Sequence, residues 1–175
     1  MLTNRCSARG PWPWHVLLSF GLLFAAGGVG AEAELLEPNP ERTAREVIVI
    51  QLEALQTNDT PSMNSGIRQV WAFAHPRNRA VTGPLARFTR MIRGPGYNVL
   101  LKHRRHQIQR LSIGDAAAVF AVQVVSRDGG FYRFRWQLRR VSTDAGAVWM
   151  TTQVSPARRT GEQLSRRSDG GRGRT

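Results

Sequence analysis

The chain has 175 residues, the size of one ordinary domain, which is small for an enzyme with separate cofactor and substrate domains. It carries 25 Lys and Arg residues against 12 Asp and Glu residues, so its formal net charge is +13. This composition excludes an acidic calcium-binding protein, a coiled coil and a membrane protein with several spans. The positive charge makes an acidic partner one of the first functions to consider.

Arginine supplies nearly all of the positive charge, because Lys102 is the only lysine. The sequence allows two explanations. The planar guanidinium group of arginine matches phosphate and carboxylate groups, so selection for anion binding would favour it over lysine. A GC-rich genome would also replace lysine by arginine, and it would enrich glycine, of which the chain has 17.

Residues 1–33 have the pattern of a signal peptide. Arg5 and Arg9 form a positive segment, residues 16–26 form an apolar segment, and small residues follow. The apolar segment is shorter than the roughly 20 residues that a spanning helix needs. We therefore expect export, to the periplasm or the medium, with an uncleaved N-terminal membrane anchor as the alternative. Cys6, the only cysteine, would leave with the signal peptide, so the mature chain would contain no disulfide and no thiolate metal site.

Three helices are predicted after a linker over residues 34–40. Apolar residues recur at a spacing of three and four positions from about residue 41, which indicates amphipathic helices. The residues at 58–61 end the first helix and begin the second, which stops before His75-Pro76. A third helix is expected from about Pro84 to Gly94.

The pattern changes to that of strands from residue 97 onward, with turns rich in Gly and Asp. Strands are expected over residues 97–101, 106–113, 116–126, 131–140 and 148–154. The fourth is the clearest, because Tyr132, Phe134, Trp136 and Leu138 alternate with Phe131, Arg133, Arg135, Gln137 and Arg139.

This order of elements predicts an α+β domain over residues 41–155. Its three N-terminal helices would pack on a curved antiparallel sheet of four to five strands, in a cone-like arrangement. Residues 156–175 contain six arginines and four glycines but only one large apolar residue, so they are expected to form a disordered tail.

Several segments, taken in order, resemble a known family. They are residues 47–59, the run 72–76 (Ala-Phe-Ala-His-Pro), Phe88 with Met91, Tyr97, and Asp128-Gly129 ahead of an aromatic strand and Trp149. Over roughly residues 44–154 this set is similar to the bacterial and plant family named domain of unknown function 4864. The resemblance implies a relation to the nuclear transport factor 2-like superfold, a cone of helices folded against a curved antiparallel sheet.

Two departures from that family concern loops: His75 stands where the family more often has Ser, and Gly94-Pro95 lengthens the turn before Tyr97. The family has no agreed activity, so the resemblance implies an architecture and no reaction.

Few residues are candidates for catalysis. Asp59 is a weak candidate for a general base at the mouth of the cone, a device that some members of the superfold use with a neighbouring His. Because it precedes Thr60-Pro61, helix capping is the simpler role. His103 and His106 would face opposite sides of a strand, which does not predict a metal site. No cofactor and no metal ion is expected.

Two sets of side chains are candidates for binding. The aromatic residues Trp71, Phe88, Tyr97, Tyr132 and Trp136 would either line a pocket between helices and sheet or simply pack in the core. On the opposite face Arg133, Arg135 and Arg139 would form a row that either binds anions or is an ordinary solvated surface.

We therefore predict a noncatalytic module that binds a small ligand or a protein partner. The alternatives are a small hydrolase or isomerase that uses Asp59, and binding of a polyanion or an anionic surface by the arginine row. A homodimer is also compatible with the sequence. Nucleic acid is not an expected partner. Export would separate the protein from the nucleic acids of the cell, and few aromatic side chains accompany the arginines for base stacking.

Overall fold

The computed structural model describes residues 34–161, so the predicted signal peptide and the end of the predicted tail lie outside the described residues. Within them four α-helices precede a 3-10 helix and five strands. The elements are α1 (Ala44–Gln56), α2 (Ser65–Ala72), α3 (Pro76–Thr82), α4 (Leu85–Arg93), η1 (Asn98–Leu100), β1 (Arg105–Ile113), β2 (Ala117–Val125), β3 (Phe131–Thr143), β4 (Gly146–Val154) and β5 (Arg158–Arg159).

Helix α1 begins at a capping box. The Thr43 side chain accepts a hydrogen bond from the Glu46 backbone N–H, and the Glu46 carboxylate accepts one from the Thr43 backbone N–H. This exchange satisfies two N–H groups that have no partner inside the helix. The predicted apolar stripe is buried, and Gln51 lies within it.

Helix α2 begins later than predicted because Asn58 holds an intervening turn. The buried Asn58 side chain accepts a hydrogen bond from Ile67 N–H at 3.0 Å, and its backbone oxygen accepts one from Gly66 N–H at 3.0 Å. A side chain at Gly66 would overlap the carbonyl oxygen of Ala54, so glycine is needed where α2 crosses α1.

Helix α3 was not predicted. The sequence pattern predicts that His75-Pro76 ends one helix, but it also begins the next: His75 Nδ1 accepts a hydrogen bond from Arg77 N–H at 3.1 Å, and Pro76 occupies the first helical position. Proline suits that position because it has no N–H to leave unsatisfied. The described residues therefore contain four α-helices where three were expected.

The sheet is antiparallel with the strand order β1-β2-β3-β4, and β5 pairs with β3. The prediction of a strand over residues 97–101 is wrong, because this segment forms η1. The Gly94 carbonyl accepts hydrogen bonds from both Tyr97 and Asn98, and Lys102 has φ 56, so turns at both ends prevent an extended strand. The α+β fold with four to five strands is confirmed.

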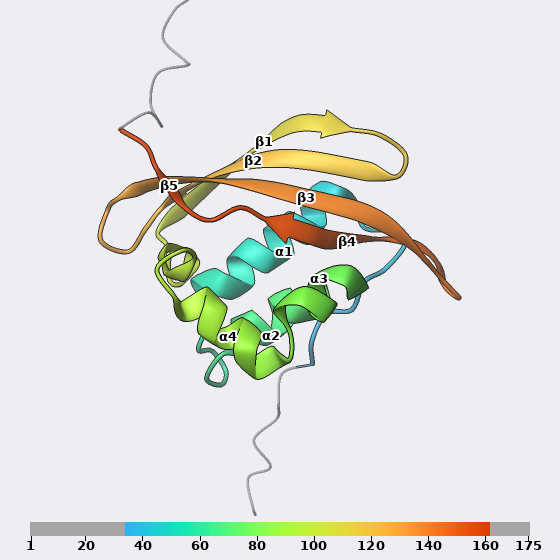
Figure 1. The fold of residues 1–175 in the computed structure, drawn as a ribbon, viewed down its shortest axis with the longest axis horizontal. Coiled ribbons are helices and arrows are strands. Elements are labelled where there is room, and N and C mark those ends of the chain that lie inside the picture. The colour runs from blue at the N-terminus through green and yellow to red at the C-terminus, as the bar shows by residue number, and fades with distance from the viewer. Residues whose placement is uncertain (1–33, 162–175) are drawn as a thin grey trace, which may run out of the picture. The chain divides into compact units, whose positions relative to one another are not determined.

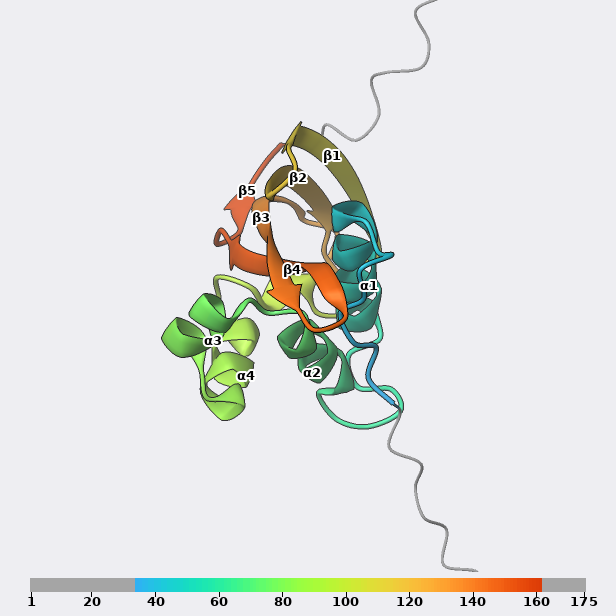
Figure 2. The ribbon, with the colours of Figure 1, turned by 90° about the vertical axis from the view of Figure 1, so that its right-hand side faces the viewer.

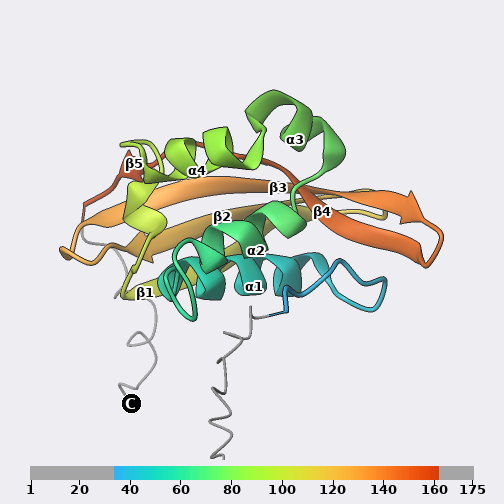
Figure 3. The same cartoon turned by 90° about the horizontal axis from the view of Figure 1, so that it is seen from below.

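The helices lie on one face of the sheet (Figure 1), and Figure 3 shows them across this face from below. Figure 2 looks along the strands and shows the curvature of the sheet. The alternation predicted for β3 is confirmed, since Phe134, Trp136 and Leu138 are buried while Arg133 and Arg135 are exposed. This buried row and the stripe of α1 belong to one hydrophobic core.

The domain continues beyond its predicted end at residue 155. Ala157 N–H donates to Gly96 O at 2.9 Å, Thr160 N–H donates to Phe131 O at 2.9 Å, and Arg159 of β5 pairs with Tyr132 of β3. Residues 156–161 are therefore part of the fold, and only residues 162–175 of the predicted tail lie outside the described residues. No helix within residues 34–161 is long and apolar enough to span a bilayer.

Candidate functional site

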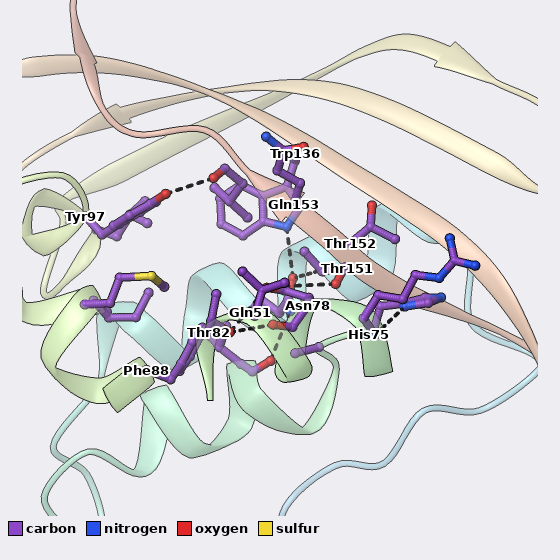
Figure 4. Close-up of a pocket in the computed structure, with 18 of the residues that line it drawn as sticks. Gln51, His75, Asn78, Thr82, Phe88, Tyr97, Trp136, Thr151, Thr152 and Gln153 are labelled. Carbon is purple, nitrogen blue, oxygen red and sulfur yellow. Dashed lines mark hydrogen bonds between the residues drawn. The ribbon is translucent and has the colours of Figure 1, made fainter. Parts of the chain in front are cut away.

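A cavity of about 690 Å³ opens between the helices and strands β3 and β4 (Figure 4). Its volume lies within the roughly 300–1,000 Å³ that small-molecule sites occupy. The inner wall is made of buried apolar side chains from α1, α2, α4, η1 and β3: Leu55, Val70, Phe88, Ile92, Leu100 and Trp136. The cavity is therefore a half-open cleft whose inner wall is formed by residues of the packed hydrophobic core.

Gln51 is the polar centre of this wall and is fully buried. Its Oε1 accepts hydrogen bonds from Trp136 Nε1 at 3.0 Å and from Thr151 Oγ1 at 2.8 Å, and its Nε2 donates to Val70 O at 3.3 Å (Figure 4). Because these groups satisfy one another, the wall does not depend on a ligand for its hydrogen bonds.

Helix α3 forms a second wall and is attached to β4. Asn78 Nδ2 donates to Thr151 O at 3.3 Å, and His75 N–H donates to the same oxygen at 2.9 Å. Thr82 Oγ1 donates to Asn78 O at 2.8 Å (Figure 4). The helix that the sequence pattern did not predict thus brings His75, Asn78 and Thr82 to the cavity.

Tyr97 closes another side of the cavity. Its hydroxyl donates to Val154 O at 3.0 Å, which joins the turn before η1 to the end of β4 (Figure 4). Burial raises the pKa of the Tyr97 phenol above its usual value, so the hydroxyl stays protonated at neutral pH. Tyr97 therefore contributes a hydrogen-bonding neutral group and not a base.

The open side of the cavity is positively charged. Arg77, Arg139 and Arg140 line it and are exposed. Burial, followed by the charges of Arg77 and Arg139, lowers the pKa of His75 below its ordinary value. His75 is thus neutral at pH 7, and because its Nδ1 accepts the Arg77 N–H, its proton belongs on Nε2.

The cavity lining contains no Asp, Glu, Cys, Ser or Lys among the residues that the structure describes. Within the same residues no three His, Cys, Asp or Glu side chains converge on a common point, as a metal ion would need. The groups present can donate hydrogen bonds, attract an anion and contact apolar surface.

The structure brings together three of the predicted aromatic residues, since Phe88, Tyr97 and Trp136 all line the cavity. Trp71 stands behind this lining and packs against Phe88 with ring centroids 5.0 Å apart. Tyr132 is packed against the core and does not line the cavity.

The polar residues of the site were not predicted from the sequence, although the position of one of them could have been recognised there. Gln51 falls on the buried stripe of α1, between Ile48 and Leu55, where an unpaired amide would be costly. A polar residue in that register indicates a buried hydrogen-bond network. Thr151 carried no comparable signal, because hydroxyl groups are common in strands.

Asp59 lies outside the cavity lining. Its Oδ2 forms an ion pair with Lys102 Nζ at 2.9 Å, and its Oδ1 accepts a hydrogen bond from Asn64 N–H at 3.1 Å. The hydrogen bond from Lys102, then that from the Asn64 backbone, lowers the pKa of Asp59. Its carboxylate holds the turn before α2, and the structure does not bring it into a cavity with His75 or Tyr97, as the general-base alternative requires.

His103 and His106 do not face opposite sides, contrary to the prediction. His103 precedes β1, and its Nε2 lies 2.9 Å from His106 Nδ1, while its Nδ1 lies 2.8 Å from Leu100 O. Since a carbonyl only accepts, His103 Nδ1 carries a proton. The pair forms a hydrogen-bonded link between the end of η1 and the sheet.

The predicted arginine row is divided between two surfaces. Arg133 and Arg135 are exposed on the face of β3 that points away from the helices, whereas Arg139 lines the cavity. The register of β3 and β4 shifts between Gln137 and Leu138, where β4 has one extra residue. Such a bulge increases the local twist of the sheet.

Comparison with known proteins identifies the family and no closer relative. No curated protein and no solved structure matches the chain significantly. A family model described as "Domain of unknown function (DUF4864)" matches residues 38–163, a range that includes every element from α1 to β5. The relation to the nuclear transport factor 2-like superfold stays a prediction. The chain belongs to the family described as Domain of unknown function (DUF4864).

Proposed function

We propose that this domain is a noncatalytic binding module that holds a small, largely apolar molecule in the cavity between the helices, β3 and β4. One observation carries the proposal: the inner wall is buried and apolar, and its polar centre, Gln51, is already satisfied by Trp136 and Thr151. Such a wall gains free energy when an apolar molecule displaces water from it.

The size of the cavity supports binding over imperfect packing. The cavity is half open to solvent and has a volume of about 690 Å³, which lies within the range of clefts that hold small molecules. Removing about 200 Å² of apolar ligand surface from water would contribute about 5 kcal/mol before the entropic cost of association. Apolar contact alone thus supports weak binding, and tighter binding needs polar contacts as well.

The chemistry of the lining supports a noncatalytic role. His75 uses Nδ1 as a hydrogen-bond acceptor for the backbone, and Tyr97 is held protonated. Neither residue has a carboxylate partner in the lining that would prepare it for acid–base work.

The test uses an uncharged fluorescent probe, N-phenyl-1-naphthylamine, whose emission rises in apolar surroundings. We expect the wild-type chain to bind it and Met91→Trp to weaken binding at least tenfold, because Met91 lines the cavity and a larger side chain would fill it. The matched control is Met63→Trp, since Met63 is 72% exposed and outside the lining. Equal binding by both variants, or no binding by the wild type, would contradict the proposal.

We further propose that the domain acts after export, which the charge and apolar pattern of residues 1–33 supports. Expressed in a bacterium, the full chain should reach the periplasm or the medium with a new N-terminus at Glu32 or Glu34. A variant with Leu17→Arg and Leu18→Arg should remain unprocessed inside the cell. Membrane-bound full-length protein would favour the anchor alternative instead.

A further inference from the structure

We propose that the ligand of this cavity is an amphipathic carboxylate, whose apolar body occupies the inner cavity and whose anionic head is bound by Arg77, Arg139 and His75. This inference rests on the proposed function and specifies its ligand class. It follows from the separation of apolar and charged side chains along the cavity wall.

The open side of the cavity has an excess of positive charge that no lining residue balances. Arg77, Arg139 and Arg140 are exposed lining residues, and the lining contains no Asp or Glu. The Arg140 guanidinium lies over the Trp149 ring, 5.2 Å from its centroid, which leaves Arg77 and Arg139 for a ligand. Within residues 34–161 the salt bridges that include an arginine or lysine join Asp59 to Arg93 and Lys102, and none of these three residues lines the cavity. The guanidinium groups of Arg77 and Arg139 are therefore available to an anion from solution.

His75 joins these two arginines into one site. It lines the same cavity, and both guanidinium charges act on its ring. Because Nδ1 accepts the Arg77 backbone N–H, Nε2 carries the proton and is a hydrogen-bond donor. Two guanidinium groups and one neutral donor, with no competing acceptor charge, match a carboxylate head.

The inner cavity determines the orientation of the ligand. Its wall is formed by residues such as Phe88, Leu100 and Trp136, and Gln51 uses its oxygen for two internal hydrogen bonds. An anion placed there would lose its hydration without a cationic partner, which is costly. The head must therefore stay at the rim while the apolar body enters.

The experiment measures the affinity of decanoate, decanol and decylamine by isothermal titration calorimetry at low salt. The wild type should bind decanoate about tenfold or more tightly than decanol, since a charge-assisted hydrogen bond is worth roughly a factor of ten. Decylamine should bind weakest because its head meets like charge. Added salt should reduce the advantage of decanoate.

The variant pair separates local from general charge effects. Arg77→Gln with Arg139→Gln should lose about tenfold or more in affinity for decanoate and keep its affinity for decanol, which also shows that the cavity is intact. The control is Arg133→Gln with Arg135→Gln, which removes the same charge from exposed positions outside the lining. The control should retain the wild-type preference.

The outcomes distinguish the two proposals. The carboxylate assignment is overturned if decanol binds as tightly as decanoate, or if both double variants lose the same affinity for decanoate. The cavity function stands in either case. If neither decanoate, decanol nor the naphthylamine probe binds, the proposed function fails and this inference with it. A second readout is the NMR titration of His75, whose pKa should rise with decanoate and not with decanol, because an anion offsets the two guanidinium charges.

Discussion

Gln51 on α1 and Trp136 on β3 are joined by a hydrogen bond of 3.0 Å, although they are 85 positions apart in the chain. The same Gln51 oxygen accepts from Thr151 on β4 at 2.8 Å. All three side chains are buried, so one amide holds the first helix to two neighbouring strands beneath the cavity.

Replacing Gln51 tests this link. Gln51→Leu keeps the approximate volume but leaves the Trp136 and Thr151 donors unsatisfied, so we expect a loss of about 2–4 kcal/mol in the free energy of unfolding, measured with urea. In the Gln51→Leu background, Trp136→Phe and Thr151→Val should cost less than in the wild type, because the donors they remove no longer have a partner. Additive losses would show that the network is not energetically coupled.

The three histidines of the described domain predict acid sensitivity. Burial is the main cause that lowers the pKa of His75, His103 and His106, and the Glu53 charge only partly opposes it at His106. The unfolded chain therefore binds more protons than the folded one at mildly acidic pH. Stability should be complete above the unfolded pKa of about 6.5 and fall as pH decreases through the lower folded values.

Urea unfolding at pH 7.5 and pH 5.5 measures this effect. His103→Asn retains an amide donor for Leu100 O but cannot titrate, so its stability should depend less on pH than that of the wild type. Equal stability of the wild type at the two pH values would contradict the predicted proton linkage.

Asp59 provides a test of the enzymatic alternative. Asp59→Asn removes a half-exposed ion pair with Lys102, so we expect a loss of about 1 kcal/mol or less in unfolding free energy. Binding of N-phenyl-1-naphthylamine should not change, because Asp59 is outside the cavity lining. A large loss of binding in a folded variant would place Asp59 in the functional site.

Truncation tests where the domain ends. A chain that stops after Gly161 should unfold like the full domain. A chain that stops after Val154 loses the hydrogen bonds of Ser155, Ala157 and Thr160 to Arg135, Gly96 and Phe131. At about 1 kcal/mol for each bond we expect a loss of about 2–4 kcal/mol. Equal thermal midpoints for the two truncations would mean that β5 contributes no stability.

The elements that could be predicted from the sequence are those with a strong local period. Strand β3 alternates apolar and polar side chains over residues 132–139, and α1 carries one continuous stripe with a capping box at Thr43. Hydrophobic periodicity and turn residues are properties of neighbouring positions, so they can be recognised in the sequence without tertiary information.

The short elements differ from their predicted structure because their local signals allow two structures. The apolar segment Asn98–Leu100 resembles a strand, but turns on both sides leave it no partner strand. His75-Pro76 ends one helical pattern and begins another, and only the packing of α3 against β4 shows which residues it presents.

The sequence by itself determined the family, the α+β class and the buried face of β3. Tertiary structure alone decided that a cleft opens against the core, because a cavity depends on how side-chain volumes from distant elements fill the space between them. The tertiary structure also decided which arginines face the cavity. Arg135 and Arg139 lie on the same strand, but only Arg139 lines the cavity. The position of a charge relative to a cavity is set by twist, register and the packing of α3, which no local pattern encodes.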